Sequence, residues 1–327
     1  MMRLPKFRYY SPRTVAEAIA TRSDAGPDGA YVAGGTDLYP NMKRRQQTPK
    51  VVVGLSRVRE LSRLGERGGG LSLGAGLLLS EVENDDRVKA SYPGLAHAVS
   101  EISTPPLRNM GTIGGNLLLD TRCNYYDQNY EWRRGINFCL KKDGDICWVA
   151  PGSSKCWAVQ SSDLVPVMVA IGAKLRFAST LGERLIDAAG LYNDDGIDYL
   201  HKRPDELLVD IQLPPTNGWR ASYQKLRRRG AFDFPVLGVA AWVDVDRGGS
   251  VSNARLILGG IAPSPLEVKE AAEALIGNPL HQHHIEAAAE AAYIKARPLD
   301  NTDFVMNWRK QMARQYTLRA LEDLRLE

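Results

Sequence analysis

The chain has 327 residues, 44% of them apolar and 24% charged, with a formal net charge of +4. This length predicts two or three domains, and the composition is that of a globular protein rather than a disordered or fibrous one. So mild a positive charge does not indicate nucleic acid, and we expect no nucleic-acid partner. We see neither a signal peptide nor an apolar run long enough to cross a bilayer, so we expect a cytoplasmic protein without membrane contact, whose thiols stay reduced.

Helical and strand-like segments alternate along the first two hundred residues. Residues 14–24 predict a helix capped by Ser11 or Thr14, because Val15, Ala18 and Ile19 share one face. Further predicted elements are a strand ending in glycines at 30–35, a strand at 50–55, a strand, turn and helix start at 71–82, a helix at 93–102, and a helix leading into a strand at 164–178.

A double proline within residues 205–220 predicts a domain boundary. Beyond it, β-rich stretches at 222–226, 235–246 and 253–262 precede helical patterns at 265–277, 283–297 and 305–324. We therefore expect a mixed α and β part over 1–216, divided near residue 60, followed by an α+β domain over 217–327.

Two glycine-rich loops are candidates for binding an anion. In VAGGTDLYPNMK (32–43) two glycines follow a strand, and NMGTIGGNLLLD (109–120) repeats the arrangement. Glycines let backbone N–H groups close on a phosphate, although a tight strand–helix turn uses the same residues. Two such loops could hold the two phosphates of one dinucleotide, and the lack of GxGxxG disfavours a Rossmann NAD site.

Five motifs then carry a family resemblance: VAGGTDL, TIGGN, SDLVPV, YQKLRRRGAFDFPVLGVAA and NARLILGGIAPSPL, in this order. They resemble the FAD-binding subunits of the xanthine oxidase family of molybdenum hydroxylases, including the medium subunit of aerobic carbon monoxide dehydrogenase. The resemblance covers essentially the whole chain. It implies an α+β fold with a two-part FAD-binding domain of the vanillyl-alcohol-oxidase type over 1–216, interrupted by an insertion at 118–160, and a CO-dehydrogenase-flavoprotein C-terminal domain over 217–327.

The resemblance also implies which residues contact FAD, and it implies no catalytic residue in this chain. A carboxylate suits a ribityl or ribose hydroxyl, and a cation suits the electron-rich edge of the flavin. The implied carboxylate is Asp163 and the cation is Lys225, for which a surface ion pair is equally plausible. The remaining implied contacts are Val32, Ala33, Gly34, Gly35, Thr36, Asp37, Leu38, Tyr39, Thr112, Gly114, Gly115, Asn116, the aliphatic Leu208, and Ile102 at a position that is often aromatic in relatives.

All four cysteines of the chain lie within the insertion, at Cys123, Cys139, Cys147 and Cys156. Four thiolates suit one tetrahedral Zn²⁺ or one [4Fe–4S] cluster, and the absence of a C-x2-C pair leaves the metal open, with disulfides and unrelated thiols as lesser alternatives. The implied flavin favours the [4Fe–4S] cluster, because a cluster would add an electron entrance.

The stretch TRCNYYDQNYEWRRG and the three later cysteines resemble the inserted loop of the 4-hydroxybenzoyl-CoA reductases, a branch of the same family in which the loop binds an additional [4Fe–4S] cluster. This resemblance implies an oxidoreductase subunit that passes electrons from ferredoxin through [4Fe–4S] and FAD to partners. The implied partners are a [2Fe–2S] small subunit and a molybdopterin large subunit in an (αβγ)2 assembly, which converts 4-hydroxybenzoyl-CoA to benzoyl-CoA in anaerobic aromatic degradation.

Three other functions remain open. The chain could serve an oxidative molybdenum hydroxylase or dehydrogenase that acts on aromatics, purines or CO. It could be a zinc-stabilised, non-redox assembly subunit, or a stand-alone flavin reductase. Basic residues in the insertion could steer an acidic ferredoxin, although simple solvation explains them equally well; they are Arg133, Arg134, Lys141, Lys142 and Lys155.

Overall fold

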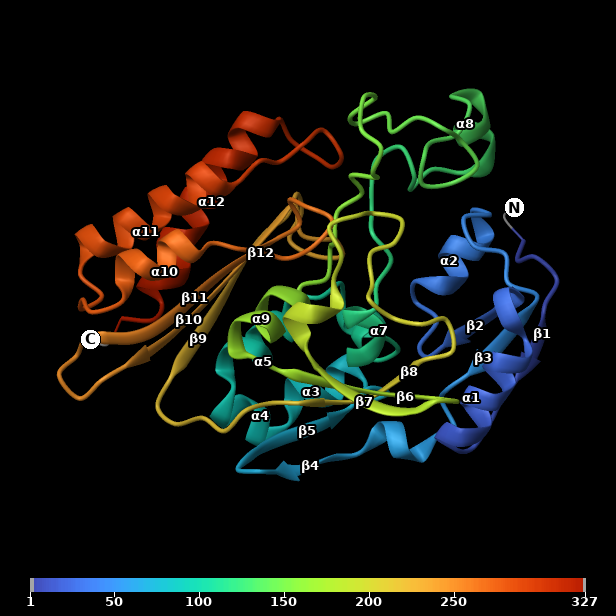
Figure 1. Ribbon diagram of the computed structural model, residues 1–327, viewed down its shortest axis with the longest axis horizontal. Coiled ribbons are helices and arrows are strands. Elements are labelled where there is room, and N and C mark those ends of the chain that lie inside the picture. The colour runs from blue at the N-terminus through green and yellow to red at the C-terminus, as the bar shows by residue number, and fades with distance from the viewer. Residues whose placement is uncertain (1–2, 326–327) are drawn as a thin grey trace.

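The computed structural model describes residues 3–325, which form three β-sheets with helices packed around them (Figure 1). The first sheet is parallel, in the order β1-β3-β2, and lies near the N-terminus. Thr14 caps the first helix by accepting a hydrogen bond from the Glu17 amide (3.1 Å), so the cap is the second of the two predicted candidates. The elements are β1 (Arg8–Tyr10), α1 (Val15–Asp24), a 3-10 turn (Gly26–Asp28), β2 (Gly29–Val32), α2 (Leu38–Lys43) and β3 (Val51–Gly54).

The second sheet is antiparallel, with the order β4-β5-β8-β6-β7. Helix α9 is buried at every position, because its eight residues are all apolar, and it ends at Gly172 in the left-handed conformation (φ 73°). The strands are β4 (Leu64–Arg67), β5 (Gly70–Gly74), β6 (Lys174–Ser179), β7 (Gly182–Asp187) and β8 (Leu207–Gln212). The helices are α3 (Leu79–Asn84), α4 (Asp86–Ser91), α5 (Pro93–Ser100), α6 (Pro105–Arg108), α7 (Ile113–Leu117) and α9 (Leu164–Ile171), with 3-10 turns at Arg59–Ser62 and Ala188–Leu191.

The third sheet is antiparallel, in the order β12-β11-β10-β9, and three helices cover one of its faces (Figure 1). Small residues let these helices pack closely against one another and the sheet, since Ala288, Ala292 and Ala313 are fully buried. The elements are β9 (Arg220–Leu226), β10 (Leu237–Val245), β11 (Val251–Gly259), β12 (Leu266–Glu267), α10 (Lys269–Leu275), α11 (Gln282–Lys295) and α12 (Met306–Glu322).

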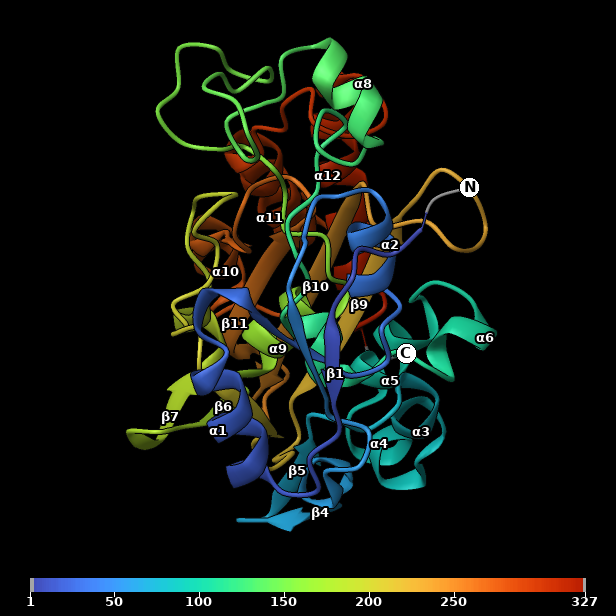
Figure 2. The same ribbon diagram turned by 90° about the vertical axis from the view of Figure 1, so that its right-hand side faces the viewer.

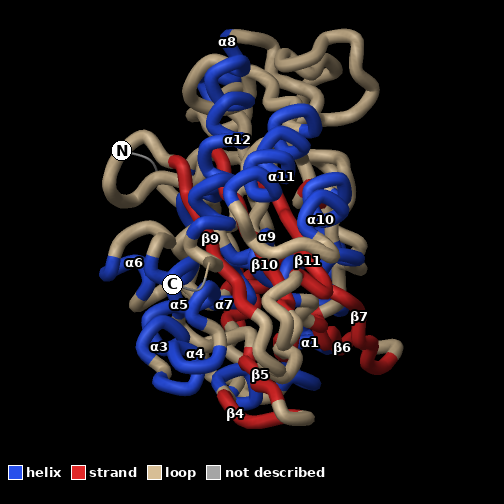
Figure 3. The backbone as a smooth tube through the Cα atoms, turned by 90° about the vertical axis from the view of Figure 1, so that its left-hand side faces the viewer, coloured by secondary structure: helices blue, strands red, loops and turns tan. Residues whose placement is uncertain are grey.

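The cysteine-bearing segment begins after α7 and ends just before α9. Its two ends meet at an antiparallel bridge in which Arg122 and Val159 exchange backbone hydrogen bonds of 2.8 and 2.7 Å. Beyond this bridge the chain extends past the sheets as loops with one short helix, α8 (Tyr130–Gly135) (Figures 2 and 3). We call residues 118–160 the insertion from here on.

The predicted elements form, except that the helical pattern at 265–277 begins with the short strand β12 before α10 starts at Lys269. The strands β1, β4 and β7 and the short helices α4, α6 and α8 were not predicted. Within residues 3–325, no helix combines the length and the hydrophobicity needed to span a membrane.

Candidate functional site

The two glycine loops, 80 residues apart in sequence, lie against each other. A Cβ atom on Gly34 would lie 1.8 Å from the carbonyl oxygen of Met110, so only glycine permits this contact between the backbones. A Cβ atom on Gly111 would lie 3.5 Å from Thr36 Oγ1. The structure therefore brings together the two segments whose amides were predicted to bind one diphosphate.

The first loop turns sharply from β2 into α2. Gly35 has φ 72°, and a Cβ atom there would lie 2.5 Å from the Tyr39 ring, so glycine is required for the turn. Thr36 is exposed, Val32 is buried, and the other predicted contacts in this loop are half-buried. Asp37 accepts a hydrogen bond from Asn41 (2.9 Å) and pairs with Arg122 of the insertion. Burial raises the pKa of the Asp37 carboxyl, while the charge of Arg122 opposes this shift.

The second loop is held by its own hydroxyl and by the neighbouring strand end. Thr112 Oγ1 accepts a hydrogen bond from the Gly115 amide (3.1 Å), and the Gly114 amide donates to the carbonyl of Ala75 (2.9 Å). Gly115 is exposed, whereas Thr112 and Gly114 are buried. Asn116 Oδ1 accepts a hydrogen bond of 2.5 Å from Ser162, whose Oγ also caps the first turn of α9.

Asp163 and Lys225, which were predicted to contact FAD separately, pair with each other. Lys225 Nζ lies 2.9 Å from Asp163 Oδ2, and the two side chains are only 1% and 4% exposed. Tyr223 donates to the other carboxylate oxygen (2.7 Å), and Lys225 also donates to the carbonyl of Glu101 (2.8 Å). This buried network joins β9 to the start of α9 and to the segment after α5, and the sequence did not predict Tyr223.

Ile102 and Leu208 are both buried. Leu208 belongs to the main apolar core, and the carbonyl of Ile102 accepts a hydrogen bond from Arg108 (2.9 Å). Their flavin contacts stay predictions.

The four cysteines of the insertion are free and buried, and they line one cavity. The open space between them is small, about 10 Å³, and Tyr125, Tyr126 and Trp148 contribute to its wall. Within residues 3–325 no group of three or more His, Cys, Asp or Glu side chains is arranged to hold a single metal ion. The HQHH run at 281–284 instead lies at the start of helix α11, with His281 as its N-cap.

Burial makes two of the four thiols less acidic. It raises the pKa of Cys123 to about 12 and that of Cys156 to about 11, while the positive charge of Lys141 acts to lower the latter. The Ala158 amide donates to Cys156 Sγ (3.4 Å). Thiolates in so buried a cavity need a compensating positive centre, and a metal centre binds cysteine as the thiolate. The donor set therefore fits a thiolate-ligated metal centre.

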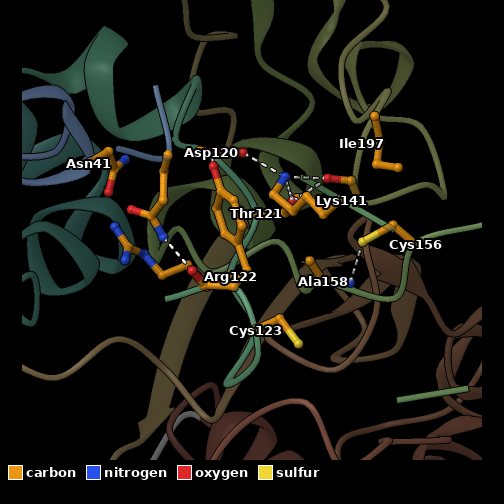
Figure 4. Close-up of polar contacts among 12 residues, drawn as sticks. Asn41, Asp120, Thr121, Arg122, Cys123, Lys141, Cys156, Ala158 and Ile197 are labelled. Carbon is orange, nitrogen blue, oxygen red and sulfur yellow. Dashed lines mark hydrogen bonds and ion pairs between the residues drawn. The ribbon is translucent and has the colours of Figure 1, made fainter. Parts of the chain in front are cut away.

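Polar side chains that the sequence did not single out join this cavity to the FAD-binding part (Figure 4). Lys141 Nζ donates to Asp120 Oδ1 (2.9 Å), Thr121 Oγ1 (2.8 Å) and the carbonyl of Gly196 (2.5 Å). Tyr126 donates to Asp120 Oδ2 (3.1 Å), and Gln46 donates to the carbonyl of Tyr126 (2.6 Å). The segment after α2 and the wall of the cavity are thus linked by hydrogen bonds.

The basic residues of the insertion do not form the free surface that steering of ferredoxin requires. Arg133 is fully buried, and Lys141 is 6% exposed. The others each lie beside a carboxylate, in the pairs Arg134–Glu131, Lys142–Asp143 and Lys155–Asp194. The steering hypothesis was wrong about Arg133 and Lys141. Arg133 donates to the carbonyl of Arg44 and Lys141 to that of Gly196, and sequence spacing does not reveal such contacts between distant segments.

The sequence and the fold both match characterised proteins over nearly their full length. Residues 5–216 match the family described as the FAD binding domain in molybdopterin dehydrogenase, and residues 221–324 match the CO dehydrogenase flavoprotein C-terminal domain. The chain is 28% identical to the carbon monoxide dehydrogenase medium chain of Hydrogenophaga pseudoflava (97% of this chain, 96% of the relative). It is 30% identical to the aldehyde oxidoreductase FAD-binding subunit PaoB of Escherichia coli (91% and 93%).

Among solved structures, the carbon monoxide dehydrogenase of Hydrogenophaga pseudoflava that lacks the Mo-pyranopterin moiety superimposes with a TM-score of 0.80 at 27% identity, covering 99% of this chain and 98% of that one. The predicted fold is confirmed, and so is the flavin-subunit resemblance. The chain therefore belongs to the family of FAD-binding domains of molybdopterin dehydrogenases and is an FAD subunit of the molybdenum hydroxylase and dehydrogenase type.

Proposed function

We propose that this chain is an electron-transfer flavoprotein subunit whose insertion holds a [4Fe–4S] cluster through Cys123, Cys139, Cys147 and Cys156. The observation that carries the proposal is the single cavity that all four buried thiols line. The relatives support the flavin and give no support for the cluster, which rests on the insertion alone.

The flavin of this subunit favours a cluster over zinc. Four thiolates can bind one Zn²⁺ or one [4Fe–4S] cube, in which each thiolate binds a different iron. Zinc is redox-inert and would only stabilise the insertion, whereas a cluster would give electrons a route to the flavin. The four buried thiols supply one ligand for each iron of such a cube.

FAD would be held where the two glycine loops meet. The half-buried Gly34 and Gly35 would offer amides near the surface for a diphosphate, and the exposed Thr36 and Gly115 lie in the same two loops. When bound, the flavin exchanges electrons singly or in pairs. The Asp163–Lys225 pair would contact the flavin as one unit, with the carboxylate and its countercharge already balanced inside the protein.

For the parent enzyme we propose reductive dehydroxylation of 4-hydroxybenzoyl-CoA to benzoyl-CoA. The support is the resemblance of the insertion, from TRCNYYDQNYEWRRG to the last cysteine, to that of the 4-hydroxybenzoyl-CoA reductases. The chain would receive electrons from reduced ferredoxin in the cytoplasm. It would pass them to a [2Fe–2S] small subunit and a molybdopterin large subunit in an (αβγ)2 assembly, and relatives named as a medium chain or a subunit support such partners.

A second candidate is an oxidative molybdenum hydroxylase or dehydrogenase. The names of the relatives favour it, because carbon monoxide dehydrogenase, aldehyde oxidoreductase and xanthine dehydrogenase subunits all match. In that case electrons would leave through the flavin toward an acceptor. The four-cysteine insertion and its resemblance to that of the 4-hydroxybenzoyl-CoA reductases favour the reductive direction over this one.

The test is anaerobic purification of the assembled enzyme, with iron, acid-labile sulfide and FAD counted per chain and EPR spectra taken after reduction. We expect about four irons and four sulfides per chain beyond those of the small subunit. Zinc without sulfide would instead support an assembly role. Substrate-dependent reduction of NAD⁺ or a quinone, without activity from reduced ferredoxin, would overturn the reductive direction and support the second candidate.

A further inference from the structure

Lys141 is the one charged residue among those that line the cysteine cavity in the described chain. Its side chain is 6% exposed, and its ammonium donates to Asp120, Thr121 and the carbonyl of Gly196. The ammonium also lies over the rings of Tyr126 (4.8 Å) and Tyr199 (5.2 Å). Figure 4 shows it turned toward Asp120 and Thr121.

Only one member of the ion pair between Lys141 and Asp120 borders the cavity. Lys141 lines it, whereas Asp120, which is 8% exposed, does not. Charges held out of water act on one another much more strongly than charges at the surface. A thiolate-ligated cluster is negatively charged and becomes more so on reduction, so a fixed ammonium beside it stabilises the reduced form.

Lys155 gives the contrasting case within the same insertion. It is adjacent to Cys156 in sequence. Its ammonium pairs with Asp194 and lies over the ring of Trp157, 3.8 Å from the ring centre. Its side chain is 28% exposed, that of Asp194 is 59% exposed, and Lys155 does not line the cavity. Water and salt screen such a pair, so its charge reaches the cavity only weakly.

We propose that Lys141 is a positioning residue whose charge sets the reduction potential of the centre in the cysteine cavity. The negative charge of Asp120 offsets part of this effect. The inference rests on the proposed function, because it needs a redox centre bound by the four cysteines. The same ammonium joins the middle of the insertion to Thr121 near its start and to the loop at Gly196, and these hydrogen bonds fix the position of the charge.

The test is an EPR-monitored redox titration of the anaerobically purified, assembled enzyme, carried out on four variants. Lys141→Met removes the ammonium and should shift the one-electron equilibrium of the cluster at least tenfold toward the oxidised form. This shift corresponds to a potential at least 59 mV lower. Asp120→Asn leaves the ammonium without its countercharge and should raise the potential. The double variant should fall between the two single variants, and Lys155→Met should match the wild type.

Opposite shifts for the two single variants support the inference, because a purely structural role would not reverse sign with the charge. Flavin content and far-ultraviolet circular dichroism check that each variant is folded. If the enzyme with Lys141→Met fails to assemble, the cluster potential of the Asp120→Asn variant still tests the inference. A wild type without iron would overturn the proposed function, whereas an iron-bearing wild type whose potential is unchanged by Asp120→Asn and Lys141→Met would overturn only the role of Lys141.

Discussion

The flavin-binding framework and the insertion are stabilised in different ways. In the framework, apolar clusters fill the space between sheets and helices, and the glycine loops meet backbone to backbone. The insertion contains one helix of six residues, and its buried interior consists largely of thiols, aromatic rings and charged groups tied by hydrogen bonds. Burial of apolar surface stabilises the first region without a ligand, whereas thiols and charges stabilise the second region only when they are paired.

Because the two regions are stabilised differently, we expect each of them to respond separately to perturbation. Changes to the glycine contact or to buried pairs of the framework should affect flavin binding and global stability. Changes at the cysteines should affect the insertion while the framework stays folded. Changing one region at a time tests whether the two regions are independent.

Replacing Gly34 by valine should abolish flavin binding. The new Cβ would lie 1.8 Å from the Met110 carbonyl, so the two loops would have to separate. The FAD content of the purified chain measures the effect. Gly65→Val is the matched control in the same domain, because nothing lies within 4 Å of a Cβ atom there. Normal flavin content in Gly34→Val would contradict the role of the loop contact.

Replacing Asp163 by asparagine should destabilise the framework by about 3–5 kcal/mol, because the buried ammonium of Lys225 loses its partner. Urea unfolding followed by flavin fluorescence and circular dichroism measures this. The double variant Asp163→Asn/Lys225→Met should recover part of the loss, since it leaves no unpaired buried charge. Equal losses in the single and double variants would argue against the pair.

Removing the metal centre should loosen only the insertion. Without a centre, the insertion has one helix of six residues and a small cluster of protonated thiols and aromatic rings, which provides little packing. Limited proteolysis after oxidation and chelation should cut within residues 118–160, and Cys147→Ser should be cut in the same places without chelation. The FAD content should stay constant. Loss of flavin together with the iron would show that the two regions are not independent.

Replacing Lys155 by methionine should change the unfolding free energy by less than about 1 kcal/mol, because its pair with Asp194 is exposed to solvent and screened. The same urea titration serves as the measurement, with and without added salt. A loss as large as that of Asp163→Asn would mean that exposed and buried pairs in this protein are equally strong.

Much of the fold was predictable because its elements carry strong local patterns. The apolar run of α9 and the glycines after β2 allowed their structures to be predicted from sequence. The three-residue strand β1 is too short to show a pattern of its own, since it forms only by pairing with β3. Strands β4 and β7, of four and six residues at the edges of their sheet, likewise depend on their neighbours.

For the site, local chemistry identified the ligand types but not their surroundings. The four cysteines and both glycine loops stand out in the sequence, because few other residues supply soft metal ligands or backbone without Cβ. Tyr223, Asp120 and Lys141 did not stand out, since tyrosine, aspartate and lysine are common surface residues. Their roles depend on burial and on partners that are distant in the chain, such as Gly196 beside Lys141.

The order of motifs along the chain was enough to establish a flavin-binding subunit with an added group of four thiols, because glycine and cysteine carry their chemistry wherever the chain places them. Which charges face one another was decided only by folding. Asp163 and Lys225, predicted as separate flavin contacts, neutralise each other in the core, and Lys141, predicted at the surface, lies beside the thiols. The reason is that the strength of a charge depends on its distance from water and from its partner, and tertiary packing sets both.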